Sequence, residues 1–471
     1  MSAAPSLNLS DHELARAGAL LTAFLRSYEH AIPAPSVLPP LNRDVLSDLL
    51  QDPFPETGIG VDRLFQVITD KIVPNSTAIA HPRFLAYVLG PPNGIAPFAE
   101  AIAATLNQNC NFWQLSPAAS VIERKVIGWL AGLFEYPVTA GGILTSGGSM
   151  ATLVALATAI QAKFSGDFRR KGLQAIRAPL VVYTSEEAHR CVEKDAVILG
   201  LGLENVRKIP VDADFRMRLD CLASAVRGDR AGGRQPFCVV AAGGTINTGA
   251  IDPIDALADF CAREDLWLHV DGAFGALFVL SPRLQPQLRP CGRADSIALD
   301  PHKLLFAPLE AGCLLVRDRE TLRRAFSFSA AYLSAESDPL FMNFMDYGPQ
   351  LSRSFKALKV WCALQAFGVR AFVAAVEHML DLARYLADRL RAEPSWELLA
   401  PVTLNAVCFR LKDGDEARNQ KILAQLVDEG TALLGPVRIR ERSGLRACIT
   451  NYRTQREDID LIVERLRQLG S

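Results

Sequence analysis

The sequence lacks several features that mark particular classes of protein. Its ten cysteines are scattered through 471 residues without a Cys-x-x-Cys pair, so neither a disulfide framework nor a zinc ribbon is expected. The formal net charge is −1, with no basic or acidic block, which gives no reason to expect nucleic acid or a membrane surface as a partner. No apolar run reaches the roughly 18 residues that a membrane span requires.

Motifs for other ligands are also missing. The sequence contains no P-loop, no Gly-x-Gly-x-x-Gly turn and no metal-ligand cluster among its seven histidines, so nucleotide, dinucleotide and metal sites are not expected. The N-terminus MSAAPSLNLSDHELARAG has no positive region followed by an apolar run, so no signal peptide is expected. Because the thiols read as reduced core residues, we expect a cytoplasmic location.

The distribution of apolar residues predicts an α/β fold. The length and a hydrophobic content of 49% allow a large core and more than one domain. Short β-rich runs alternate with helical runs from 141 to about 315, which favours a mostly parallel sheet. Strands are expected at 180–183, 206–209, 237–241, 266–270, 296–299 and 312–316. We divide the chain into an N-terminal helical segment (1–84), a large domain (85–355) and a small C-terminal α/β domain (356–471).

Three short stretches within the large domain indicate a common chemistry. Gly147, Gly148 and Ser149 precede a helical run, and small residues at a helix N-terminus leave N–H groups free to bind phosphate. Asp271 ends a predicted strand, where its carboxylate could keep a pyridine nitrogen protonated. Lys303 follows another strand, and a lysine that sheds its proton there can attack a carbonyl. In this chain order the three stretches describe a site for pyridoxal 5′-phosphate (PLP).

The sequence resembles the group II PLP-dependent amino-acid decarboxylases from about residue 75 to the C-terminus. The resemblance rests on these segments, in register: HPRFLAY, FWQLSPAAS, TSGGSMATLVAL, SEEAHRCVEKDAVILGLG, AGGTINTGAIDPI, LHVDGAFGA, LDPHKLLFAPLEAGCLLVRD, SFKALKVW and LRACITNYRT. It implies the fold of fold-type I PLP enzymes, with a seven-stranded, mostly parallel sheet, and a homodimer with active sites at the interface.

The resemblance also implies roles for single residues. Lys303 would carry the cofactor and Asp271 would hold the ring nitrogen, while the ring would lie on Ala273. The further cofactor contacts that it implies are Gly147, Gly148, Ser149, His189, Thr245, Asp300 and His302. Asp300 stands where many animal relatives carry Asn, and since an acid is unfavourable beside a phosphate, we expect it to be hydrogen-bonded away from it. Ile246 replaces the second of two adjacent threonines.

Two of these residues would take part in the reaction itself. His189 matches the histidine that stacks on the cofactor ring and helps with proton transfer. Tyr332 lies in a long polar segment, 328–350, that reads as a functional loop, and it matches the tyrosine that protonates the α-carbon after CO2 leaves. Keeping both residues favours simple decarboxylation over the reaction of aldehyde synthases, and an aminotransferase is the other alternative.

The substrate pocket is predicted to include Tyr87, Asn111, Trp113 and Arg446. Tyr87 and Trp113 match aromatic positions of the aromatic-amino-acid decarboxylases, whereas Val88 and Asn111 stand where those enzymes have phenylalanine. The sequence therefore favours an aromatic L-amino acid as the substrate. An acidic or polar amino acid, such as Glu, Asp, cysteine sulfinate or 2,4-diaminobutyrate, is the alternative.

Overall fold

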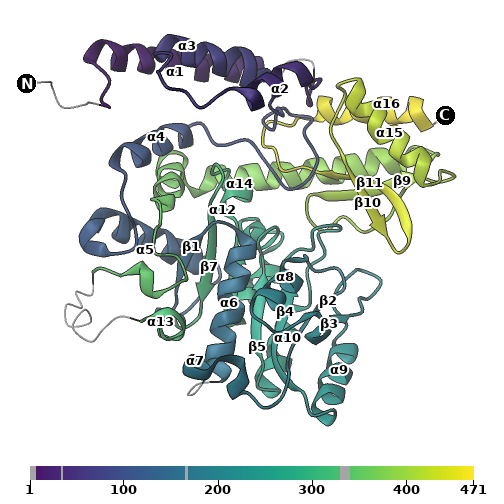
Figure 1. Cartoon of the computed structure of the whole chain (residues 1–471). Helices are drawn as coiled ribbons and strands as arrows, with labels where there is room; N and C mark the ends of the chain where they lie inside the picture. Colours follow the sequence, from purple (N-terminus) through teal and green to yellow (C-terminus); the bar gives the residue numbers. More distant parts are fainter. Residues whose placement is uncertain (1–6, 33–35, 165–167, 329–339, 471) are drawn as a thin grey trace, which may run out of the picture.

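A seven-stranded sheet forms the centre of the larger part of the molecule (Figure 1). The computed structural model describes residues 7–32, 36–164, 168–328 and 340–470. The strands are β1 (Gly141–Thr145), β2 (Leu180–Ser185), β3 (Val206–Ile209), β4 (Gln235–Ala242), β5 (Trp267–Asp271), β6 (Ser296–Leu299) and β7 (Gly312–Val316). They lie in the order β1-β7-β6-β5-β4-β2-β3.

The sheet is mostly parallel, as predicted. Strands β3, β2, β4, β5 and β6 run parallel to one another, whereas β7 is antiparallel to both β1 and β6. Every residue of β1, β2, β6 and β7 is buried, as in a sheet that is covered on both faces.

Strand β1 was not among the predicted strands, because Gly141 and Gly142 have low β propensity. The second of these glycines is required here, since a Cβ atom on Gly142 would come within 2.1 Å of the carbonyl oxygen of Leu314 on β7.

Helices surround the sheet and connect its strands. In the large domain they are α4 (Ala96–Leu106), α5 (Pro117–Gly132), α6 (Gly148–Lys163), α7 (Phe168–Lys171), α8 (Cys191–Ile198), α9 (Leu219–Ala231), α10 (Ile254–Arg263), α11 (Gln285–Leu288), α12 (Pro301–Leu304) and α13 (Arg319–Phe326). Helix α6 crosses the sheet and contacts β1, β4, β5, β6 and β7 (Figure 1). Its N-terminus therefore lies where several strands meet.

The C-terminal part forms the predicted smaller α/β unit. Its strands are β8 (Trp396–Leu398), β9 (Ala406–Leu411), β10 (Gly435–Ile439) and β11 (Arg442–Cys448), and its helices are α14 (Lys356–Arg391), α15 (Glu416–Asp428) and α16 (Arg456–Gly470). The four strands form an antiparallel sheet in the order β10-β11-β9-β8. Helix α14 contacts α4 and α5 of the large domain as well as β8 and β9, so one helix joins both parts. The division at residues 84 and 355 stays a prediction.

Helix α14 is the longest helix of the described residues. Among the described residues it is the one helix that is long and apolar enough, by length and composition alone, to cross a membrane. Its apolar side packs inside the fold, where Phe372, Val376 and Met379 are buried. Gly368 interrupts the helix with a φ of 69°. Of its most apolar 18-residue window, 22% is buried inside the fold.

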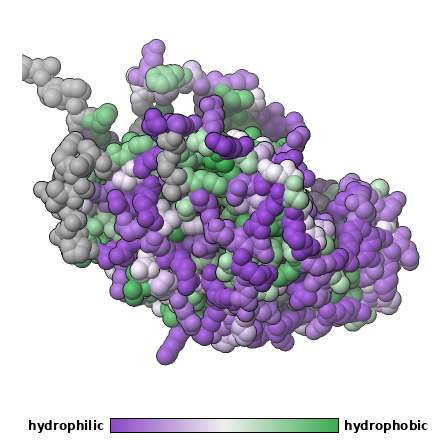
Figure 2. Space-filling view, turned by 90° about the horizontal axis from the view of Figure 1, so that it is seen from below, coloured by the Kyte–Doolittle hydropathy of each residue, from purple (hydrophilic) through white to green (hydrophobic). Residues whose placement is uncertain are grey.

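The N-terminal segment lies along the outside of the molecule (Figure 1). Its helices are α1 (Asp11–Ala31), α2 (Arg43–Gln51) and α3 (Val61–Val67), and most of their residues are exposed. An ion pair between Glu29 and Arg453 at 2.9 Å ties α1 to the C-terminal part. On the face seen in Figure 2 the surface is mostly hydrophilic, with hydrophobic residues in small groups between the polar ones.

Candidate active site

A cavity of about 340 Å³ opens at the carboxyl ends of the central parallel strands. It contains residues that follow β1, β4, β5 and β6, which is where open α/β sheets bind ligands. The predicted cofactor residues that line it are Gly147, Gly148, Ser149, His189, Thr245, Asp271, Ala273, Asp300, His302 and Lys303. The fold therefore brings together all the residues that the sequence predicted around the cofactor.

One end of the cavity is formed by the N-terminus of α6. Helix α6 begins at Gly148, and no side chain of the described residues caps it, so its first N–H groups are free to bind an anion. A Cβ atom on Gly148 would come within 2.5 Å of the Cβ atom of Ala273 and within 3.2 Å of Oδ2 of Asp300. Only glycine fits this position, and the geometry suits a phosphate group.

Asp271 is the last residue of β5 and points into the cavity. Its Oδ1 accepts a hydrogen bond from the backbone N–H of Ala273 at 3.2 Å, and its Oδ2 accepts one from the thiol of Cys191 at 3.8 Å. Two residues earlier on the strand, burial lowers the pKa of His269 to about 4, so this imidazole is neutral. The Asp271 carboxylate therefore has no cationic partner on its own strand, which suits the protonated nitrogen of a pyridine ring.

Lys303 lies on the short helix α12, directly after β6. Its Nζ is 2.9 Å from Oδ2 of Asp300, whose carboxyl group is buried with 3% exposure. The pair places Asp300 in the wall of the cavity beside Lys303, rather than behind the residues that line it. Oδ1 of Asp300 accepts no hydrogen bond from a described residue, so this buried oxygen remains available to a group in the cavity.

His302 and Thr245 complete the wall of the cavity. His302 contacts the carbonyl oxygen of Ala311 through Nδ1 at 2.8 Å, and burial lowers its pKa. The hydroxyl group of Thr245 lies 2.9 Å from that of Thr248 and accepts a hydrogen bond from the N–H of Ala250. Ile246 lines the cavity next to Thr245 and offers it only an apolar side chain.

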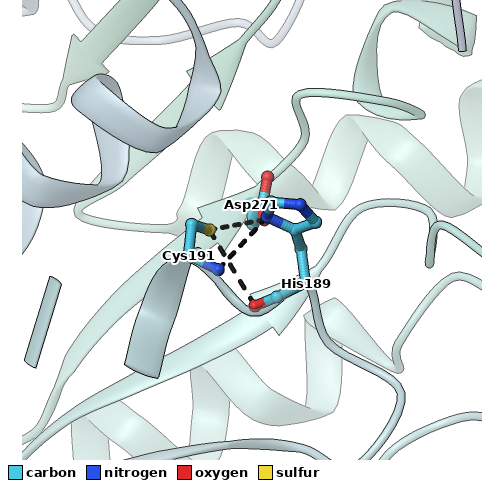
Figure 3. A group of neighbouring side chains, drawn as sticks. All are labelled: His189, Cys191 and Asp271. Carbon is cyan, nitrogen blue, oxygen red and sulfur yellow. Dashed lines mark hydrogen bonds between the residues drawn. The ribbon is translucent and has the colours of Figure 1, made fainter. Parts of the chain in front are cut away.

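His189 precedes α8 and faces Asp271 and Cys191 (Figure 3). Its Nδ1 accepts a hydrogen bond from the N–H of Cys191 at 3.2 Å. The donor atoms of the three residues lie within 4.8 Å of one another, a metal-like grouping that the sequence analysis did not expect. However, burial and then the charge of Asp271 raise the pKa of the Cys191 thiol. A thiol that keeps its proton is a poor metal ligand, so the arrangement serves hydrogen bonding to Asp271.

The predicted substrate residues do not line this cavity in the single chain. Tyr87 is 66% exposed, and Trp113 stacks on Phe341 with ring centres 4.3 Å apart. Asn111 keeps a buried side-chain oxygen, Oδ1, that accepts no hydrogen bond from a described residue. Arg446 is 6% exposed and donates to the carbonyl oxygens of Tyr87 and Asn247, both at 3.1 Å, while its Nη2 has no partner among the described residues. Tyr332 lies outside the described residues.

Two further residues were not predicted from the sequence: a thiol that lines the cavity and a buried carboxyl group on the same helix. Cys191 lines it, and its position two residues after His189 is the only signal that pointed to it. Asp195 lies one helical turn after Cys191 on α8 and is 3% exposed. Nothing in the sequence alone distinguishes this acid from an ordinary surface residue of a helix.

Comparisons with known proteins agree with this geometry. The pyridoxal-dependent decarboxylase conserved domain matches residues 44–412. The chain is 33% identical to an aromatic-L-amino-acid decarboxylase from Bacillus atrophaeus (99% of this chain and 97% of that protein), and 32% identical to an L-2,4-diaminobutyrate decarboxylase from Rhizobium meliloti (90% and 84%).

Among solved structures, it resembles that of Oryza sativa TDC with PLP and tryptamine, with a TM-score of 0.91, 25% identity and 99% of both chains covered. The cavity, its phosphate-sized turn and its lysine fit the same cofactor. The chain therefore belongs to the group II PLP-dependent decarboxylase family, and it is a pyridoxal 5′-phosphate-dependent amino-acid decarboxylase.

Proposed function

We propose that this decarboxylase acts on an aromatic L-amino acid and releases the corresponding amine and CO2. The observation that carries the proposal is the 33% identity to an aromatic-L-amino-acid decarboxylase over 99% of the chain. The likeness to a structure with bound tryptamine supports it, as do the aromatic residues Tyr87 and Trp113.

Each residue around the cavity has a proposed task in holding the cofactor. The free N–H groups at the start of α6, with Ser149 and His302, would bind the phosphate group. Asp271 would accept a hydrogen bond from the N–H of the ring nitrogen, and Lys303 would bind the cofactor covalently. Bound PLP supplies an electron sink for the electron pair of the broken bond between the α-carbon and the carboxylate.

Proton transfer and substrate orientation fall to other residues. His189, which faces Asp271, would cover the other side of the ring from Ala273 and contact the substrate carboxylate. Arg446 has an unpartnered guanidinium nitrogen, Nη2, that would bind an anionic group of the substrate. Tyr332 would donate a proton to the α-carbon after CO2 leaves.

The active site would be completed by a second copy of the chain. Tyr87 is exposed and, like Asn111 and Trp113, does not line the cavity of its own chain, so these side chains would serve the site of a partner. Apolar side chains that a partner could cover, such as Phe98 (50% exposed) and Phe367 (47%), lie around a second hollow of about 880 Å³ between α1, α4 and α14. A homodimer is therefore part of the proposal, whereas the cytoplasmic location stays a prediction.

A polar amino acid is the second candidate substrate. The identity of 32% to an L-2,4-diaminobutyrate decarboxylase is nearly as high, and the free oxygen of Asn111 could accept a hydrogen bond from an amine. An amide in place of an aromatic ring makes the pocket more polar.

The test is CO2 release from the purified, PLP-loaded protein with the twenty amino acids, DOPA, cysteine sulfinate and 2,4-diaminobutyrate. Release with Tyr, DOPA, Phe or Trp supports the proposal. Release only with 2,4-diaminobutyrate or an acidic amino acid replaces it with the second candidate. The Lys303→Ala variant is the control, because CO2 release without this lysine would come from a contaminating enzyme.

A further inference from the structure

Behind Asp271 lies a second buried carboxyl group, that of Asp195 on α8. Its side chain is 3% exposed, and its Oδ2 accepts no hydrogen bond from a described residue. It lies four residues after Cys191, so both project from the same side of the helix. The thiol of Cys191 in turn contacts Oδ2 of Asp271 (Figure 3). Two carboxyl groups and a thiol thus share one buried region next to the cofactor cavity.

Within the described part of the chain, neither Asp195 nor Asp271 forms an ion pair with a cation. Burial and then the charge of Asp271 raise the pKa of Asp195, and the charge of Lys194 on the same helix opposes this shift. His269 on β5 is neutral, and His189 is exposed before the helix. The charged residues on the elements that pack against α8 have other partners or are exposed: Lys163 pairs with Asp265, Arg207 with Asp229 and Lys208 with Glu193, and Glu204 is exposed.

Because like charges are unfavourable near one another, the charge of Asp271 disfavours a charge on the buried Asp195. Burial, followed by the charge of Asp271, raises the pKa of Asp195 to about 7. Below this pH Asp195 is neutral. Above it Asp195 is charged, and a cation placed at Asp271 is attracted by one more negative charge nearby.

We propose that Asp195 is a positioning residue of the active site that controls how strongly Asp271 holds the proton of the cofactor ring nitrogen. The inference rests on the proposed contact between Asp271 and that nitrogen. Its consequence is that the preference of the site for a protonated ring increases as the pH rises and Asp195 loses its proton. The residue touches neither the substrate nor the cofactor and acts only through its charge.

The test compares the binding of two ligands that do not need to react with Lys303. These are pyridoxamine 5′-phosphate and its analogue with a C–H group in place of the ring nitrogen, each titrated into the apoprotein by calorimetry at pH 5.5 and pH 8. Their affinity ratio isolates the ring nitrogen, because phosphate and amine are the same in both. For the unmodified protein we expect the ratio to rise about tenfold between the two pH values, the size of a charge interaction at moderate distance.

The variants assign this rise to Asp195. Asp195→Asn should give the same ratio at both pH values, whereas Asp195→Glu, which keeps a carboxyl group, should retain the rise. Glu193→Gln is the matched control, since it removes an acid from the same helix that pairs with Lys208 at the surface, at 3.1 Å. If Asp195→Asn shows the same rise as the unmodified protein, the inference is wrong.

Two further outcomes separate the inference from its premise. If the unmodified protein binds both ligands equally at each pH, Asp271 does not hold the ring nitrogen, and the proposed role of Asp271 fails together with the inference. If the nitrogen ligand is preferred by a constant ratio, only the role of Asp195 fails. This measurement needs no variant, so it decides the question even if Asp195→Asn does not fold.

Discussion

The buried ion pair between Arg353 and Glu123 is predicted to stabilise the turn between β1 and α6. The two side chains are 5% and 1% exposed and contact each other directly. Arg353 also donates to the carbonyl oxygens of Cys110 (2.6 Å) and Leu144 (3.0 Å), while Glu123 accepts the N–H of Leu144 at 3.0 Å. Leu144 lies on β1, immediately before the turn that leads to α6. The pair thus fixes the strand that positions the phosphate-binding turn.

We predict that Arg353→Met lowers the free energy of unfolding by about 3–5 kcal/mol, because Glu123 remains buried without its partner. Unfolding in urea, followed by tryptophan fluorescence at a fixed protein concentration, measures this loss. PLP affinity should fall as well, since the turn after Leu144 loses its support. Arg16→Met is the control: it removes an exposed ion pair with Asp62 at 2.6 Å, and such pairs contribute about 0–1 kcal/mol.

The double variant Glu123→Gln with Arg353→Met separates pairing from packing. It leaves no buried charge, so we expect it to be more stable than Arg353→Met alone. A loss below about 1 kcal/mol for Arg353→Met would refute the reasoning, because an unpaired buried carboxylate costs more than that. The reasoning would also be refuted if the double variant lost as much stability as the single variants Arg353→Met and Glu123→Gln lose together, since the two charges would then act independently.

The remaining predictions concern the reaction and its pH dependence. Lys303→Ala should abolish covalent attachment of the cofactor and its visible absorbance; an unchanged spectrum would remove this lysine from its role. Tyr332→Phe should divert the product from amine to aldehyde, measured by chromatography, and amine formed alone at an unchanged rate would contradict its proton transfer. Asn111→Phe should raise kcat/KM for bulky aromatic substrates relative to small ones, and an unchanged ratio would place Asn111 outside the pocket. Burial and then the charge of Asp271 raise the pKa of Asp195 to about 7 in the folded protein, so its contribution to stability is fully present below about pH 4 and is lost as the pH rises through 7. Asp195→Asn should therefore reduce the loss of stability between pH 4 and pH 8, and identical urea profiles would contradict it.

Most of the fold could be predicted because the patterns are local. Six of the seven central strands were predicted, and five of these are short, largely apolar runs that can be identified without knowledge of their neighbours, whereas β3 contains Arg207 and Lys208. Strand β1 was not predicted because it begins with two glycines. A Cβ atom on Gly142 would collide with Leu314 of β7 and one on Gly141 with Arg319 of α13, and these requirements exist only after the chain has folded. The antiparallel direction of β7 is likewise a property of the assembled sheet.

The sequence by itself determined the cofactor chemistry of this protein. The residues predicted to bind the phosphate, the ring nitrogen and the carbonyl carbon lie in short motifs, and the type of each side chain indicates its chemistry. Only the tertiary structure decided which charges meet: Asp300 with Lys303, and Asp195 behind Asp271. It also decided that Tyr87 is exposed and does not line the cavity of its own chain. Burial and charge pairing depend on residues that are distant in the sequence, so no local pattern contains them.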